Sequence, residues 1–530
     1  MPGRLAIDFG TSNTVVARWD DVQQQGVPLH VPDYGRFYAH GSERVSVIPS
    51  LIHYASDHQH WVGNQVLQRN LTQSARTLRW LKRRIADRLP GNLRLDGKDI
   101  SPADAGRDFL ATVLAFAAAE LQLGDEEIAL TVPVEAFEHY EDWLTSVAEA
   151  AGIPRFRLID EPSAAALGYG THIQPGHVYL IFDFGGGTLD VAIVLIEEEE
   201  ATAVGRRCRV LGKAGADVGG ITIDQWLFQD VLRRNHRSAA DDDVRAISNA
   251  LLVECERAKE QLSDHDRTEI NVMHPDTGML LSAAFTQGEF EELLDQHDAF
   301  TRIDQTIRRA LNAARERGYD EEHIQTVLMV GGSSLIPAVQ RTVQRIFGKD
   351  RVRWDRPLDA VARGAAAFVA GVDFYDHIQH DYAIRHVNPH QSDYDYRIIV
   401  KRGTPYPATE PVARMTLKAT YDGQTQLGIA VFEIGVRQQR RRDQPVELVF
   451  DPSGAARVTH LTSDEEERRT FFWMNEHSPT FLMATPPAKQ GEPRFAVTFG
   501  IDGNKRLLIT ARDVQTGQVT HRDYPVIKLT

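Results

Sequence analysis

Hydrophobic and polar positions along the chain predict two strand–turn units that share one local pattern. Residues 5–9 alternate, whereas 178–184 form a continuous apolar run that is followed by a second apolar run over 189–195. Both units contain Asp-Phe-Gly, at residues 8–10 and 183–185, and small residues come next. Runs of this length that end at glycine are typical of β-strands with tight turns. The sequence therefore predicts that one strand–turn unit occurs twice.

Helical spacing marks three long segments. Hydrophobic residues recur with a helical period over 102–121, 244–262 and 301–317. Ser101 precedes the first segment and Pro102 occupies its first helical position, a combination typical of helix starts. Because strands alternate with helices up to about residue 372, the pattern predicts α/β layers.

The pattern becomes strictly β in the last part of the chain. Residues 374–396 show little periodicity, and we expect a linker there. In the range 397–530, alternating runs flank Asp422-Gly423 and Asp502-Gly503, and Asp-Gly between such runs predicts a β-hairpin. We therefore expect an α/β domain over 1–373, then the linker, then an antiparallel β domain.

Composition limits the class of protein. The chain has 530 residues, of which 42% are hydrophobic, so we expect folded cores in two to four domains. Its net charge of −15 argues against nonspecific binding to nucleic acid or to an anionic membrane. Only Cys208 and Cys255 are present, which favours a reducing compartment. With no signal peptide or membrane-length apolar run, we expect a cytoplasmic protein.

The repeated Asp-Phe-Gly turns have a chemical interpretation. Glycine lets the backbone approach a ligand closely, and successive N–H groups in a tight turn cradle an anion. A carboxylate beside such a turn repels phosphate unless a divalent cation lies between them, and Mg²⁺ fits that position. Two copies therefore predict two phosphate-holding hairpins that face each other across a cleft.

Two further segments extend this site. The buried run 327–330 is followed by Gly331-Gly332-Ser333-Ser334, where glycines would let a base or ribose lie against the backbone. Asp160 and Glu161 precede a helix of small residues, and one of the two carboxylates could orient water or a hydrated metal. The chain contains no Gly-Lys-Ser/Thr P-loop and no His-Glu-x-x-His zinc motif.

In these motifs the chain resembles the DnaK-type chaperones of the heat shock protein 70 family, within the actin-like ATPase superfamily. Thr131-Val132-Pro133 and Cys255-Glu256-Arg257-Ala258-Lys259 resemble two more signatures of that family. One motif is a weak signal, but six in the same order and spacing are specific, and the match covers most of the chain. The resemblance implies a two-lobed actin-like ATPase domain with a duplicated core, followed over 397–530 by a β-sandwich substrate-binding-like domain without a helical lid.

The resemblance also implies ATP or ADP with Mg²⁺, which Asp8 and Asp183 would hold through its waters. Lys82 would neutralise charge on the γ-phosphate, and Glu161 would position the attacking water or the metal's waters. Thr188 would present its hydroxyl and backbone N–H to the phosphates, so Lys82, Glu161, Asp183 and Thr188 are the expected catalytic residues. The other residues expected to bind the nucleotide, besides Asp8, are Gly10, Thr11, Ser12, Asn13, Gly185, Gly186, Gly187, Asp190, Gly219, Gly220, Glu256, Lys259, Glu260, Gly331, Gly332, Ser333 and Leu335.

The chain departs from the family's pattern at several positions. Glu260 and Leu335 stand where family members carry the two arginines that sandwich adenine. Glu141 stands where an arginine coupled to Pro133 is expected. Within an enlarged region over 436–480, Arg440-Arg441-Arg442 reads as a solvated turn, and Phe471 to Met474 reads as a core strand or as a peptide-contacting patch.

Other readings remain open for two groups of residues. Lys82 lies beside Arg79, Arg83 and Arg84 and can equally be part of a solvated basic helix end. Histidines at 53, 58 and 60, and those of the expected linker, have spacing that could fit a metal, but solvated surface positions are the more economical expectation.

The function expected is an ATP-binding, Mg-dependent, slowly hydrolysing chaperone that couples nucleotide state to peptide binding by the β domain. Its partners would be unfolded or extended polypeptides and co-chaperones, with neither nucleic acid nor membrane. The alternative is a nucleotide sensor or scaffold with little turnover and no peptide coupling. A filament-forming ATPase or a sugar kinase of the same superfamily is a third hypothesis, against which the appended β domain argues.

Overall fold

The computed structural model describes two compact units. The first comprises residues 1–134, 143–375 and 445–460, and the second comprises 135–142, 376–444 and 461–530. The residues described are all except 1–3, 41–42, 57–58, 89–91, 121–126, 134–137, 154, 171–173, 175, 197–207, 371–373, 376–377, 379, 389–392, 405, 407, 409, 435–445, 451–455, 461–470, 476–478, 503–505 and 530.

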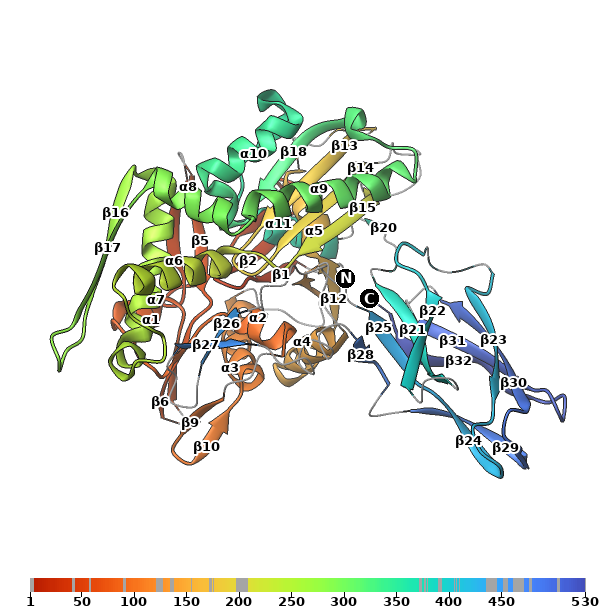
Figure 1. Cartoon of the computed structure of the whole chain (residues 1–530). Helices are drawn as coiled ribbons and strands as arrows, with labels where there is room; N and C mark the ends of the chain where they lie inside the picture. The colour runs from red at the N-terminus through yellow and green to blue at the C-terminus, as the bar shows by residue number, and fades with distance from the viewer. Residues whose placement is uncertain are drawn as a thin grey trace. The chain divides into compact units, whose positions relative to one another are not determined.

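The first unit is built on two large sheets with related strand arrangements (Figure 1). One has the order β12 (Phe156–Asp160), β11 (Ile128–Val132), β1 (Leu5–Phe9), β2 (Asn13–Asp20), β5 (Glu43–Pro49) and β4 (Arg36–His40), with β3 (Gln25–Pro28) paired to β2. The other has the order β19 (Val352–Arg353), β18 (Ile324–Val330), β13 (Val178–Phe184), β14 (Leu189–Ile196), β15 (Cys208–Ala216) and β20 (Phe374–Tyr375).

The two sheets repeat one local topology. In the first, β1 runs antiparallel to β2 and parallel to β11. In the second, β13 runs antiparallel to β14 and parallel to β18. The strands predicted over 5–9, 178–184 and 189–195 are therefore confirmed, and each Asp-Phe-Gly ends the central strand of an equivalent three-stranded group.

Two helices pack against each other between these sheets. They are α5 (Glu161–Gly168) and α11 (Ala360–Val369), and one hydrophobic core holds residues of both helices and both sheets. A Cβ at Gly364 would lie 1.6 Å from the carbonyl oxygen of Ala164, and one at Gly168 would lie 1.7 Å from that of Ala360. Only glycine permits this approach of the two helix backbones, and the approach fixes the start of α5 relative to the strands.

The expected helices are confirmed. The segments predicted over 102–121, 244–262 and 301–317 correspond to α3 (Pro102–Glu120), α7 (Asp242–Asp264) and α9 (Ala299–Arg315). The other helices are α1 (Asn64–Gln68), α2 (Leu81–Ala86), α4 (Glu138–Ala150), α6 (Gly220–Arg234), α8 (Gln287–Gln296) and α10 (Pro337–Phe347), with a 3₁₀ turn, η3, over Gly332–Leu335.

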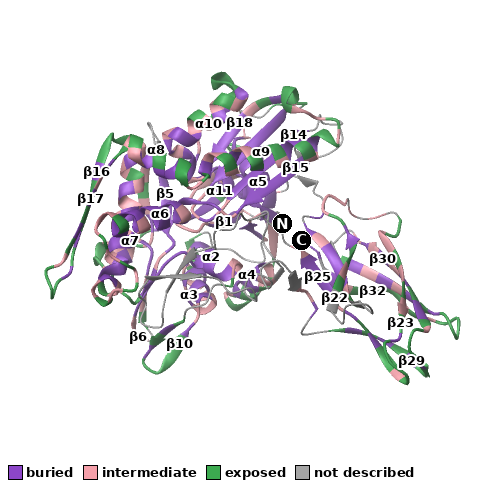
Figure 2. Ribbon diagram, viewed as in Figure 1, coloured by how far each residue is buried: buried purple, intermediate pink, exposed green. Residues whose placement is uncertain are grey.

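Smaller sheets complete the first unit. They are β6 (Ile52–Ser56) with β7 (Gln59–Val62) and β8 (Thr77–Leu78), β9 (Leu93–Leu95) with β10 (Lys98–Ile100), β16 (Arg267–Met273) with β17 (Leu280–Thr286), and β26 (Val446–Phe450) with β27 (Ala456–His460). Figure 2 shows burial concentrated in the central strands and in α5, whereas the β16–β17 ribbon alternates between buried and exposed positions.

The second unit consists of β-sheets around one core. Its strand orders are β22 (Asp393–Val400), β21 (Asp381–Asn388), β25 (Val431–Ile434), β28 (Phe471–Trp473), then β23 (Ala413–Lys418), β30 (Pro493–Ile501), β31 (Arg506–Asp513), β32 (Val519–Lys528), and β24 (Gln424–Ile429) with β29 (Thr480–Ala488). Both four-stranded sheets and the β24–β29 pair contribute side chains to the core.

The structure corrects one hairpin and the expected linker. Asp422-Gly423 does form a turn, but β23 pairs with β30 and β24 pairs with β29, so no hairpin joins the flanking strands. The strands that flank Asp502-Gly503, β30 and β31, pair antiparallel as predicted, and residues 503–505 lie outside the described residues. The range 374–396 contains β20, β21 and the start of β22, where we expected a linker. β20 pairs with β15 and β21 with β25, both distant in the chain, whereas β21 and β22 are neighbours that pair with each other.

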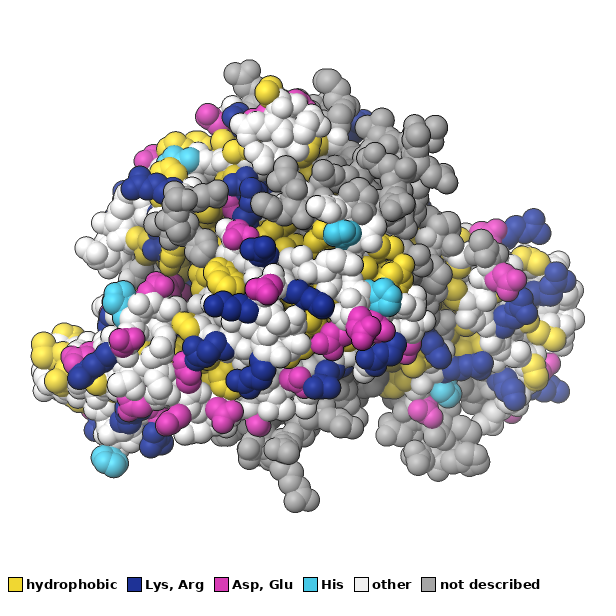
Figure 3. Space-filling model, turned by 90° about the horizontal axis from the view of Figure 1, so that it is seen from above, with side chains coloured by type: hydrophobic (Ala, Val, Ile, Leu, Met, Phe, Trp, Pro, Cys, Tyr) yellow, Lys and Arg dark blue, Asp and Glu magenta, His cyan; other side chains and the backbone are white. Residues whose placement is uncertain are grey.

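Two other expectations concern the surface and the enlarged region. Phe471 to Trp473 form the strand β28 at the edge of its sheet, with Trp473 half-buried, so the strand is confirmed but not its place in the core. Arg440-Arg441-Arg442 lies outside the described residues. Acidic and basic side chains are interspersed on the described part of the face shown in Figure 3. No helix among the residues described is long and apolar enough to span a membrane.

Candidate functional site

The two glycine-containing turns face each other within the first unit. A Cβ placed on Gly186 would lie 2.6 Å from Ser12 Oγ, and one on Gly187 would lie 2.8 Å from Thr11 Oγ1. Larger residues would therefore collide with the opposite turn. A cavity of about 230 Å³ borders both turns. Two tight glycine turns meet at this cavity, and the backbone of such turns can cradle an anion.

Most of the predicted site residues line this cavity. Two of them do not, Asp190 and Gly219. Those that do are Asp8, Gly10, Thr11, Ser12, Asn13, Lys82, Glu161, Asp183, Gly185, Gly186, Gly187, Thr188, Gly220, Glu256, Lys259, Glu260, Gly331, Gly332, Ser333 and Leu335.

Three carboxylates gather at the centre of the cavity. Asp183 and Glu161 are buried and Asp8 is partly buried, where it accepts a hydrogen bond of 2.7 Å from Thr131 Oγ1. Loss of solvation raises the pKa of Asp183 well above its ordinary value, and the negative charges of Glu161, Asp190 and Asp8 raise it further. Loss of solvation also raises the pKa values of Asp8 and Glu161, although the charge of Lys82 opposes both shifts.

Lys82 lies inside the site. Its side chain is buried on α2, and its ammonium group forms an ion pair and a hydrogen bond with Glu161. The alternative of a solvated helix end is wrong, because Arg79, Arg83 and Arg84 are buried as well. The pair joins α2 to the first residue of α5 and places one positive charge among the three carboxylates.

Asp190 does not line the cavity but contacts a residue that does. It is 2% exposed and accepts a hydrogen bond of 2.8 Å from Thr188 Oγ1. The register of the second hairpin pairs it with Asp183 across β13 and β14. Asp190 is thus placed to orient the Thr188 hydroxyl, which does line the cavity.

The start of α6 supports the second turn. The backbone N–H groups of Gly220 and Ile221 donate to the carbonyls of Gly185 and Gly186, at 3.0 and 2.8 Å. A Cβ on Gly219 would lie 2.5 Å from the carbonyl carbon of Gly187, so this position has no room for a side chain. Gly219 therefore buttresses the turn rather than lining the cavity.

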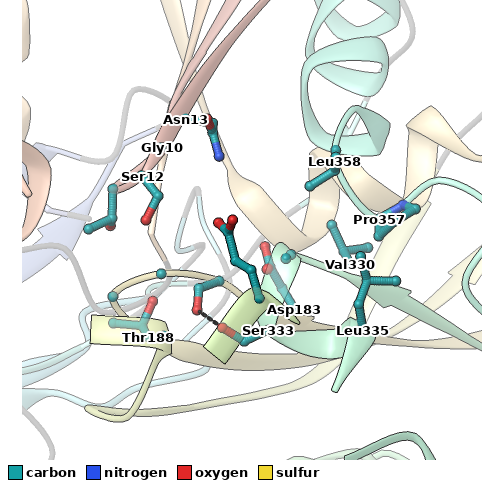
Figure 4. Close-up of a pocket in the computed structure, with 18 of the residues that line it drawn as sticks. Gly10, Ser12, Asn13, Asp183, Thr188, Val330, Ser333, Leu335, Pro357 and Leu358 are labelled. Atoms are coloured by element: carbon teal, nitrogen blue, oxygen red, sulfur yellow. Dashed lines mark hydrogen bonds between the residues drawn. The ribbon is translucent and has the colours of Figure 1, made fainter. Parts of the chain in front are cut away.

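The glycine pair after β18 closes the site on another side. Gly331 has φ +82°, and a Cβ there would lie 2.4 Å from the carbonyl group of Phe184. Ser333 Oγ donates a hydrogen bond of 2.9 Å to the carbonyl oxygen of Gly185 (Figure 4). The loop that leads into η3 is in this way tied to the turn between β13 and β14.

Away from the turns, α7 and β4 line the cavity. Lys259 Nζ forms a buried ion pair of 2.8 Å with Asp224 Oδ1 and donates to the carbonyl oxygen of Gly220. The Tyr38 hydroxyl lies close to the Glu260 carboxylate, and the two groups influence each other's ionisation. Burial, followed by the charge of Glu260, raises the pKa of Tyr38 to about 12. These contacts form a polar wall at this end of the cavity.

Sequence reasoning missed eight of the lining residues. Ser263 and Asp264 lie three and four positions after Glu260 on α7, so helical spacing could have identified them. Val330 and Ile336 adjoin predicted residues. Tyr38 and the segment that leads into α11 carry no local signal of a site. The full set is Tyr38, Ser263, Asp264, Val330, Ile336, Pro357, Leu358 and Val361.

The donor set fits a hydrated divalent cation. Asp8, Asp183 and Glu161 place three carboxylates in a poorly solvated site. Lys82 supplies a positive charge there, but its ammonium group is already paired with Glu161. Among the described residues, no group of three or more His, Cys, Asp or Glu side chains is arranged to hold a metal directly. The arrangement therefore suits Mg²⁺ held through water, since Mg²⁺ often retains several of its waters.

Two histidines expected at the surface are buried. His53 Nδ1 lies 2.9 Å from Thr77 Oγ1 in a buried contact. His380 is 3% exposed, and its Nε2 lies 3.6 Å from Glu433 Oε1. Each imidazole thus packs in a core beside a polar partner that the linear spacing does not reveal. His58 lies outside the described residues.

Comparison with known families agrees with this geometry. A family model described as Hsp70 protein matches residues 5–445, which is more than half of the chain. The match includes both Asp-Phe-Gly turns, the start of α5, α7 and the glycine pair after β18. The chain therefore belongs to the Hsp70 protein family.

Proposed function

We propose that the cavity binds a nucleoside triphosphate, ATP by analogy with the family, and hydrolyses it slowly. The observation that carries this proposal is the facing pair of glycine turns with Asp8, Asp183, Glu161 and Lys82 gathered between them. Phosphoryl transfer needs little covalent chemistry from the protein, and positioning with charge stabilisation supplies most of the acceleration. The cavity offers both.

Each group of residues in the cavity has its own role in the proposed reaction. Backbone N–H groups near Thr11 and Gly186 hold the phosphates, and Lys82 balances charge on the terminal phosphate. Mg²⁺, held through its waters by Asp8 and Asp183, would neutralise the β- and γ-phosphates. Thr188, oriented by Asp190, and Glu161 then position the attacking water.

Single-turnover phosphate release from [γ-³²P]ATP tests this site. Asp183→Asn keeps the size of the side chain but loses its charge, so hydrolysis should fall about 10²–10³-fold, in the range seen when one charge-stabilising group is removed. Asp242→Asn is the matched control, because that carboxylate is 97% exposed at the start of α7. Equal rates in the two variants contradict the assignment.

We further propose that the second unit forms a β-sandwich that binds extended polypeptide and that nucleotide state controls this binding. Family membership supports the proposal, as do the exposed apolar side chains of Phe481 and Met483 on β29, which can contact a peptide. The ATPase rate, measured with a panel of extended hydrophobic peptides, tests both sites together. Stimulation supports coupling.

The alternative is a nucleotide sensor or scaffold in which turnover is uncoupled from peptide. Glu260 and Leu335, in place of the family's arginines, favour it, because they alter the site away from the phosphates. A nucleotide at 100 times its Kd would still stabilise the fold by about 2.7 kcal/mol. A thermal shift with ATP that is accompanied by neither phosphate release nor peptide stimulation supports this alternative.

A further inference from the structure

The end of the cavity away from the glycine turns has one polar wall and one apolar wall. Glu256, Glu260, Ser263 and Asp264 share one face of α7, because they are separated by four, three and one residues. The other wall is apolar, and Figure 4 shows several of its side chains grouped apart from Ser12 and Thr188. That wall consists of Val330, Leu335, Ile336, Pro357, Leu358 and Val361.

Both walls adjoin the phosphate end at the same place. A Cβ on Gly220 would lie 2.9 Å from Ser333 Oγ and 3.1 Å from Lys259 Nζ. Leu335 follows Ser333 by two positions, and Glu260 is the residue after Lys259. A base attached to phosphates held at the turns would therefore enter the space that Leu335 and Glu260 line.

Glu260 lines the cavity, and its carboxylate lies close to Tyr38. Burial and the charge of Glu256 raise the pKa of this carboxylate, whereas Lys259, Arg36 and the nearby Tyr38 hydroxyl favour its charged form. The Arg36 guanidinium lies 4.9 Å from the centre of the Tyr38 ring, so these two side chains also pack together. A carboxylate has about four lone-pair sites, so one neighbouring hydroxyl leaves capacity for the base.

The charge of Glu260 distinguishes the two purines. Guanine presents two neighbouring donors, N1–H and the 2-amino group, which match the two oxygens of a carboxylate. Adenine presents one donor, the 6-amino group, beside the lone pair of N1, which a carboxylate repels. Hydrogen bonds to charged groups are stronger than those between neutral groups. A base that cannot donate both hydrogen bonds to the carboxylate therefore binds more weakly.

We propose that Glu260 reads the base and that this cavity binds guanine nucleotides more tightly than adenine nucleotides. The inference rests on the proposed binding of a nucleoside triphosphate, and it replaces adenine, the base that the family analogy suggests, with guanine. Tyr38 is the expected positioning residue, because its hydroxyl lies close to the carboxylate. The apolar wall around Leu335 packs on the face of either purine and does not discriminate between them.

Equilibrium titrations of the full chain with Mg²⁺ and GDP, IDP or ADP test the proposal. We expect GDP to bind about 10-fold or more tightly than ADP, the gain of a charge-assisted hydrogen bond. IDP lacks the 2-amino group and should fall between them. Glu260→Gln offers one acceptor and one donor, which suit adenine, so the ratio of GDP to ADP affinity should fall about 10-fold or more. Tyr38→Phe should reduce the ratio by less.

Glu254→Gln is the matched control, because it removes a carboxylate from the same helix at a position that pairs with Arg257 and does not line the cavity. Its ratio should equal that of the parent chain. ADP binding at least as tight as GDP binding in the parent, or an unchanged ratio in Glu260→Gln, overturns the inference while leaving the phosphate site standing. Failure of all three nucleotides to bind rejects the proposed function itself, and the inference with it.

Discussion

The Thr188 hydroxyl donates a hydrogen bond of 2.8 Å to the Asp190 carboxylate, which is 2% exposed. Because the proton of Thr188 is directed to Asp190, the lone pairs of its oxygen are left for the cavity. An acceptor at that position can orient a water molecule, whereas a freely rotating hydroxyl cannot do so with the same precision. A residue outside the cavity thus determines how a residue inside it presents its oxygen.

Thr188→Val therefore should slow hydrolysis while leaving nucleotide binding nearly intact. Valine keeps the β-branched shape and removes the oxygen, and we expect a decrease of about 10²-fold in the single-turnover rate. Thr188→Ser retains the hydroxyl and is the matched control, with a rate close to that of the parent. A parallel decrease in affinity for the nucleotide in Thr188→Val would instead assign the hydroxyl to ground-state binding.

The Lys82–Glu161 ion pair should be worth more to stability than a surface pair. Lys82→Met leaves the Glu161 carboxylate buried without its partner, and we expect unfolding in urea to become easier by about 3–5 kcal/mol. Glu161 can relieve part of this cost by taking up a proton, because burial already raises its pKa.

The double variant Lys82→Met with Glu161→Gln is the control for that prediction. It removes both charges, so most of the lost stability should return, although hydrolysis should stay low. If the double variant were as unstable as Lys82→Met alone, the loss would come from packing rather than from the unpaired carboxylate.

The repeated turn was predictable because its chemistry lies within a few consecutive residues. Asp183, Gly185 and Thr188 lie within six consecutive residues, and strand periodicity places them at the end of a strand. The helix that carries Glu256 and Glu260 follows from its spacing in the same way. Sequence reasoning therefore identified the two glycine turns and the part of α7 that line one cavity.

The missed residues are those that only tertiary packing brings together. Tyr38 belongs to β4 and reaches Glu260, although more than 200 positions of the chain lie between them. Pro357 and Leu358 form part of the apolar wall because of how the segment before α11 packs. The hairpin predicted at Asp422-Gly423 was wrong for the same reason, since an Asp-Gly pair specifies a turn but not which strands pair.

The substitution Asp183→Asn should have opposite effects on the Tm in the absence and in the presence of ligand. Its pKa is raised in the folded state, so the folded protein binds this proton more tightly than the unfolded chain does. Stability from this group is therefore present at low pH and is lost as pH rises from about 3.8, the ordinary value, toward the raised pKa. At pH 7, Asp183→Asn should raise the Tm of the ligand-free protein.

The same variant should lose most of the extra Tm that Mg²⁺ with ADP gives the parent. Differential scanning fluorimetry in EDTA and in Mg²⁺ with ADP measures both effects. Asp242→Asn again provides the control, with both values unchanged, because that carboxylate is almost fully exposed. A lower Tm for Asp183→Asn in EDTA would show that the carboxylate is stabilised by its neighbours rather than strained by them.

The α5–α11 contact should tolerate no side chain. A Cβ on Gly364 would lie 1.6 Å from the carbonyl oxygen of Ala164, which is far inside contact distance and belongs to backbone that cannot rotate away. Gly364→Ala should therefore destabilise the first unit by about 3 kcal/mol or more and displace Glu161, the first residue of α5. Gly288→Ala is the control, because that exposed glycine of α8 has no atom closer than 4.0 Å to the added Cβ and alanine favours helix. Urea unfolding with nucleotide titration would separate the two outcomes, since a stable Gly364→Ala variant with full affinity contradicts the close approach of the two helices.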